Sequence, residues 1–117
     1  MNRTPTNMLK REIDLMMKPL VTASIAFRVG TADSSHYHDM AAAFMIAMRC
    51  AETISRHNHL KAELQPAGRA MCAIFDREGW KAEPSEMAAI EEGVEIYRAI
   101  LMATPRKMLS RAIRTAV

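Results

Sequence analysis

The chain has 117 residues, of which half are apolar and a quarter are charged, and its formal net charge is +3 at neutral pH. This length fits a single domain, and the composition is typical of a folded globular protein rather than of a disordered chain. It contains no run of about 18 apolar residues, so a membrane-spanning helix is excluded. We therefore expect one domain over residues 1–117 with no role inside a membrane.

The apolar stretch at 20–27 follows several basic residues, as a signal peptide would. However, the stretch is short, and Glu12 and Asp14 lie where a signal peptide is purely basic. Cys50 and Cys72 lie far apart, without the spacing of a metal site or a disulfide framework. We expect a cytoplasmic protein in which both cysteines are buried, reduced thiols.

The first predicted helix runs from about residue 7 to Met17, and Lys18-Pro19 interrupts it. Residues 20–29 then alternate apolar and polar side chains with the period of two that is typical of a strand. A helix is the alternative. We favour the helix because the chain offers no second strand for pairing, and a sheet needs more than one strand.

The dominant feature is the segment of about residues 34–64, which contains neither glycine nor proline and is rich in helix-forming residues. It follows a turn at 30–33 in which Asp33 can cap the helix. A continuous helix over this segment would be about 46 Å long. The sequence therefore predicts an all-α fold, a small helical bundle built round this one long central helix.

One face of the long predicted helix is apolar, and it comprises Met40, Ala43, Phe44, Ala47, Ala51 and Ile54. The helix is apolar on more than one side, as expected for a helix packed among others. It is also too long for a globule of this size. We therefore expect a homodimer with this face as its interface, where the alanines allow a close approach of two helices.

Three further helices are predicted, each beginning at a proline: 66 to about 78, 84 to about 103, and 105 to about 115. Gly79 is a suitable residue to end the first of them, so that Trp80 can pack on Phe75. Gly93 lies within the apolar arc of the second. Because glycine is unfavourable inside a helix, we expect a close helix crossing at this position.

Two histidine pairs, His36 with His38 and His57 with His59, invite a metal-site interpretation. Residues two apart point about 200° apart on a helix, so neither pair can chelate one ion. Ser34 and Ser35 beside His36 look like the start of a helix rather than a catalytic triad. We expect no metal, no cofactor and no catalytic activity.

The C-terminal segment, 104–117, predicts a short amphipathic helix with an apolar face that includes Leu109 and Ile113. The candidate phosphate-binding residues on its other side are Arg106, Lys107, Arg111 and Arg114. Such a helix can contact nucleic-acid phosphates with a modest, salt-dependent affinity. It can equally be an ordinary terminal helix that docks its apolar face.

The chain contains eleven methionines, a residue that is flexible, polarisable and frequent on adaptable binding surfaces. Most of them can be explained as filling of a core that has few aromatic residues. Met45 and Met102 fall on otherwise polar sides of their helices, and Met48 falls at a core edge. We interpret these three as residues of an exposed apolar surface that binds a protein partner.

The turn at 30–33 leads into His38-Asp39-Met40-Ala41-Ala42-Ala43-Phe44, which begins the apolar stripe. In this general build the chain resembles the small helical anti-activators that bind LuxR-type quorum-sensing regulators, and also helical proteins of bacterial plasmids and phages. The resemblance implies a non-enzymatic bacterial protein that covers the dimerisation or DNA-binding surface of a transcription factor. No functional residue of those proteins is transferred to this chain on the basis of the resemblance. Nucleic-acid binding through the basic C-terminal helix is the alternative function.

Overall fold

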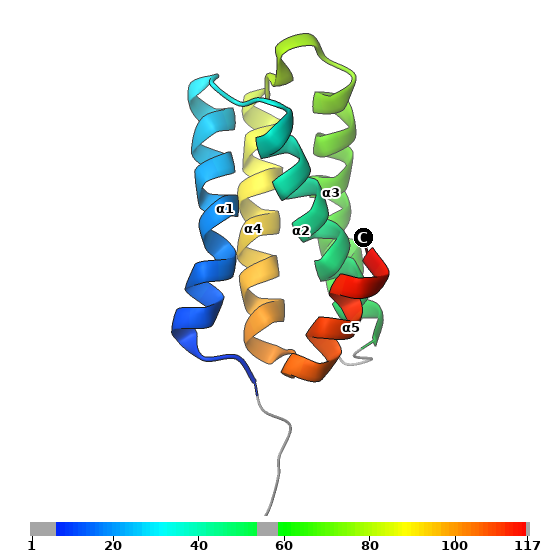
Figure 1. Ribbon diagram of the computed structural model, residues 1–117. Helices are drawn as coiled ribbons and strands as arrows, with labels where there is room; N and C mark the ends of the chain where they lie inside the picture. The colour runs from blue at the N-terminus through cyan, green and yellow to red at the C-terminus, as the bar shows by residue number, and fades with distance from the viewer. Residues whose placement is uncertain (1–6, 54–58, 117) are drawn as a thin grey trace, which may run out of the picture.

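The computed structural model describes residues 7–53 and 59–116, and these form an all-α bundle without a β-strand (Figure 1). The elements in chain order are α1 (Lys10–Val29), α2 (Ser34–Thr53), α3 (His59–Phe75), the 3₁₀ turn η2 (Glu78–Trp80), α4 (Pro84–Ala103) and α5 (Arg106–Ala116). The predicted all-α class is therefore confirmed. None of the helices in the described ranges is long and apolar enough to cross a membrane.

The first four helices run alternately in opposite directions, and each packs against the helix before and after it (Figure 1). α1 and α4 also pack against each other, which closes the ring of four. The short α5 crosses the end of the bundle and packs on α2. The result is an antiparallel four-helix bundle with a fifth helix at one end.

α1 is one continuous helix, so the predicted interruption at Lys18-Pro19 is wrong and the helical alternative for 20–29 is confirmed. Pro19 removes the hydrogen bond that its N–H would donate to the carbonyl of Leu15. Both residues are exposed, so water can satisfy that carbonyl. α1 ends at Gly30, which has a φ of 82° and is the left-handed residue that ends many helices.

The predicted continuous helix over 34–64 is also corrected. α2 ends at Thr53, α3 begins at His59, and the two helices lie side by side in opposite directions. Folding back lets apolar faces on several sides of this segment be buried within one chain, which a single extended helix cannot achieve. α3 then continues through the exposed Pro66 instead of beginning there.

The core lies along the bundle axis, and its largest fully buried side chains include Tyr97, Met17, Met40, Leu64 and Ile74. Burial raises the pKa of Tyr97 to about 12. α3 and α4 approach closely at Gly93, where a Cβ would lie 2.7 Å from the Cβ of Ala67 and 2.9 Å from Cε1 of Phe44. The predicted close helix crossing at Gly93 is therefore confirmed.

Candidate protein-binding groove

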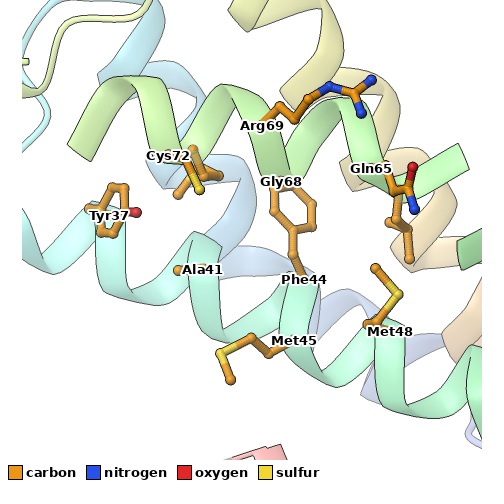
Figure 2. Close-up of a pocket in the computed structure, with 11 residues that line it drawn as sticks. Tyr37, Ala41, Phe44, Met45, Met48, Gln65, Gly68, Arg69 and Cys72 are labelled. Carbon is orange, nitrogen blue, oxygen red and sulfur yellow. The ribbon is translucent and has the colours of Figure 1, made fainter. Parts of the chain in front are cut away.

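An apolar groove of about 650 Å³ lies between α2 and α3 (Figure 2). We call it the α2/α3 groove. α2 contributes Tyr37, Phe44, Met45 and Met48, whereas α3 contributes Gly68 and Cys72 as well as polar residues at its edge. The groove is open to solvent, since Met45 and Cys72 are both exposed.

The groove exists because the facing helices carry small residues along it. Ala41 lies on the α2 side and Gly68 on the α3 side (Figure 2), whereas the Phe44 ring packs inward against Gly93 of α4. Apart from its chain neighbours and the backbone of its own helix, a Cβ at Gly68 would meet no heavy atom of the described residues within 4 Å. Glycine inside a helix costs about 1 kcal/mol relative to alanine, and no internal packing requires it here. Gly68 therefore leaves open space that another molecule can approach closely.

Aromatic side chains bound one end of the groove. The ring centroid of Tyr37 lies 5.5 Å from that of Phe75 and 5.1 Å from that of Trp80. Phe75 and Trp80 are 6.1 Å apart in an edge-on arrangement, so the predicted contact between them is confirmed. Phe75 nevertheless remains 60% exposed, which extends the apolar surface beyond the groove.

Ion pairs bound the opposite end. Glu52, one turn beyond Met48 on α2, lies 3.5 Å from Nζ of Lys61 on α3 and 3.6 Å from the guanidinium of Arg49. The pair with Lys61 joins the two helices where the groove ends. All three side chains are at least a third exposed, so these pairs contribute little to stability and mainly set the local charge.

The structure separates the three methionines that the sequence singled out. Met45 is 52% exposed, Met48 is half-buried, and both line the α2/α3 groove. Met102 is 59% exposed but lies in a smaller pocket of about 350 Å³ between the start of α1 and the end of α4. The predicted partner surface can therefore include Met45 and Met48 together, but not Met102.

The residues assigned to a dimer interface lie inside the single chain, and this is a correction. Five of them are buried: Met40, Ala43, Phe44, Ala47 and Ala51. They pack against the other helices of the same bundle, because the chain folds back on the face that a second copy was expected to cover. Ile54 lies outside the described residues.

The basic side chains of α5 lie on the side of the helix that faces solvent. Leu109 and Ala112 are buried where α5 packs on α2, so the helix docks its apolar side. Arg106 forms an ion pair with the Glu12 carboxylate at the start of α1. The other three basic side chains, Lys107, Arg111 and Arg114, are exposed.

The cysteines differ, although both were expected to be buried. Cys50 is buried, and desolvation raises the pKa of its thiol. Cys72 is exposed in the α2/α3 groove, which corrects the prediction for this residue. Within the described ranges, no three His, Cys, Asp or Glu side chains come together as metal ligands. His36 instead bonds to Asp33 at the start of α2, and His57 lies outside the described residues.

Sequence reasoning found Met45 and Met48 but missed Tyr37, Gly68 and Cys72 as residues of the site. A mid-helix glycine was the one available signal, and it becomes informative only once α2 is known to lie opposite. Comparisons of this chain with protein-family models, with curated proteins and with solved structures found no match. Its function is therefore inferred from the groove and the surface around it.

Proposed function

We propose that this chain is a non-enzymatic regulatory protein that binds another protein through the α2/α3 groove. One observation carries the proposal: the chain has an open apolar groove of about 650 Å³, and no side chain of residues 7–53 or 59–116 fills the space beside Gly68. Exposed contiguous apolar surface of this kind typically marks a protein contact. Met45 and Met48 supply flexible side chains that can adapt to a partner.

An amphipathic helix is the partner structure that fits this groove. Tyr37 and Met48 mark the extent of the groove along α2, which corresponds to about 16 Å or three helical turns. A helix of three to four turns inserts apolar anchors at positions i, i+3 or i+4, and i+7 into such grooves. The small side chains at Ala41 and Gly68 would let its backbone approach closely.

The resemblance to anti-activators of quorum sensing suggests the kind of partner. In this proposal the bound helix belongs to a bacterial transcriptional regulator in the cytoplasm. Occupying the groove would cover the dimerisation or DNA-binding surface of the regulator. The regulator would then stay silent until its concentration exceeds that of this protein.

Affinity capture from the native host, with nuclease treatment and physiological salt, tests the proposal. We expect the wild-type chain to enrich one stoichiometric protein, and Met45→Glu and Gly68→Leu to lose it. Met102→Glu is the matched control, because Met102 is equally exposed but lies outside the groove. If the groove variants retain the same partner as the wild type, the groove is not the binding site.

A homodimer also remains a proposal, but it requires a different surface from the one predicted. α1 exposes four large apolar side chains along its length: Leu15, Val21, Ile25 and Val29. Light scattering distinguishes a dimer from a single chain of 13.1 kDa. If the wild type is a dimer and Ile25→Glu dissociates it, the contact lies on α1. A wild-type mass near that of one chain would refute dimerisation.

Nucleic-acid binding through α5 is the second candidate. The exposure of Lys107, Arg111 and Arg114 on the side opposite the docked face favours it. Arg111→Glu combined with Arg114→Glu should abolish binding to duplex DNA, and the wild-type affinity should fall steeply with salt. Binding that is indifferent to salt would contradict this function.

A further inference from the structure

Arg69 lines the α3 rim of the α2/α3 groove, whereas Arg49 lies next to Met48 at the α2 rim and is not itself one of the lining residues. Arg49 follows Met45 by one turn on α2, and Arg69 follows Gln65 by one turn on α3. In Figure 2 the side chain of Arg69 lies along the outer side of α3, away from α2. A helix that lies in the groove would therefore have a basic side chain beside each flank of its apolar face.

Carboxylates of the described residues balance only part of the positive charge near the groove. Glu52 is the carboxylate shared by Arg49 and Lys61 at the end of the groove. Within the described parts of the chain, no carboxylate forms an ion pair with Arg69. The negative charge of Asp76 lies near Tyr37, at the other end of the groove. Arg49, Lys61 and Glu52 together therefore leave one positive charge at that end of the groove, Arg69 adds another on the α3 side, and the floor is apolar.

We infer that the occupant of the groove is an amphipathic helix with acidic residues on both flanks of its apolar face. The inference rests on the proposed function and specifies the chemistry of the partner. Carboxylates on the two flanks would pair with Arg49 on one rim and Arg69 on the other. Such charge pairs at the edge of an interface accelerate association and select the partner more than they raise its affinity.

Two other occupants fit less well. α5 of a second copy is amphipathic, but Lys107, Arg111 and Arg114 on its open face would meet the arginines of the rims. A fatty acid could offer a carboxylate to Arg69. However, small-molecule sites usually enclose most of the ligand surface, whereas this groove is open and its Met45 and Cys72 are exposed.

Two synthetic helical peptides of about four turns test the inference by fluorescence anisotropy. They share the same leucine and phenylalanine face and differ only at the flanking positions, which are glutamate in one and lysine in the other. The test variant combines Arg49→Glu with Arg69→Glu. The matched control combines Arg111→Glu with Arg114→Glu, which makes the same change in net charge on α5. All four positions are exposed, so folding should be retained, as circular dichroism can verify.

We expect the wild type to bind the acidic peptide about tenfold more tightly than the basic peptide at low salt, and less selectively at high salt. The test variant should reverse this preference, and the control should keep it. If the wild type binds both peptides equally and Gly68→Leu abolishes that binding, the inference of an acidic partner is overturned and the proposed function stands. Binding of neither peptide would contradict the proposed function itself. Displacement of the acidic peptide by dodecanoate at low concentration would instead assign the groove to a lipid.

Discussion

Gly68 and Gly93 lie in neighbouring helices, yet alanine should have opposite effects at the two positions. At Gly93 the new Cβ would lie 2.7 Å from Cβ of Ala67 and 2.9–3.0 Å from the Phe44 ring. Ala67 and Phe44 are themselves buried, so neither can move freely. Overpacking of a core costs about 1–3 kcal/mol. Against this, alanine regains about 0.5–1 kcal/mol of helix stability.

The difference at the middle of these two ranges is about 1 kcal/mol, so Gly93→Ala should lower the free energy of unfolding by roughly this amount, and by about 2.5 kcal/mol at most. At Gly68 the new Cβ would meet no heavy atom of the described residues within 4 Å beyond its own stretch of helix, so only the helix-forming preference of alanine remains. Gly68→Ala should raise the free energy of unfolding by about 0.5–1 kcal/mol.

Urea denaturation followed by circular dichroism at the helix band measures both variants. In thermal melts a change of 1 kcal/mol corresponds to about 4 °C for a domain of this size. A Gly93→Ala variant as stable as the wild type would show that α3 and α4 do not cross closely. A destabilised Gly68→Ala variant would show that the groove is filled by the chain itself, which would refute the reasoning behind the binding site.

Three further predictions concern the core, the loop before α4 and the thiols. Met40→Ala should cost about 2–5 kcal/mol of unfolding free energy, because Met40 is fully buried within the chain, whereas a dimer-interface role would make the loss depend on protein concentration. Arg77 donates hydrogen bonds of 2.6 and 2.9 Å to Glu86 and lowers the pKa of that carboxyl from its ordinary 4.5. The ion pair therefore stabilises the fold fully above pH 4.5, and this stabilisation is lost as the pH falls through the lowered pKa. Glu86→Gln should thus be less stable than the wild type at pH 7, with a difference that shrinks in acid denaturation curves below pH 4.5, and a constant difference would contradict this. In the native protein Cys72 should react with a thiol reagent far faster than Cys50, and equal rates would mean that Cys50 is not buried.

Local signals in the sequence predicted part of this fold well. Pro84 and Thr104-Pro105 marked the limits of α4, because a proline at a helix start acts within a few residues. Gly93 revealed a helix crossing for a similarly direct reason: a buried glycine inside a helix usually needs a steric explanation.

The errors came from features that only tertiary structure decides. Pro19 and Pro66 were treated as helix boundaries, but both face solvent, where the unpaired carbonyl one turn earlier can bind water. The reversal between α2 and α3 has no glycine or proline to mark it. It follows from burying apolar faces in one chain, and it turns the predicted dimer face into a core.

For the same reason, the sequence predicted only part of the candidate site. Met45 and Met48 stood out because they break the polar pattern of one helix. Tyr37, Gly68 and Cys72 belong to the site only because α3 lies antiparallel to α2. No pattern within a single helix could indicate that relation.

Protection of Cys72 on binding would show directly whether a partner occupies the α2/α3 groove. Cys72 is an exposed thiol inside the α2/α3 groove, so it reports occupancy of the groove without any substitution. Its alkylation rate, followed by mass spectrometry, should fall about tenfold when the captured partner or the acidic peptide occupies about nine-tenths of the protein, because only the free fraction then reacts. An unchanged rate at saturation would show that the partner binds elsewhere and would contradict the account of the groove.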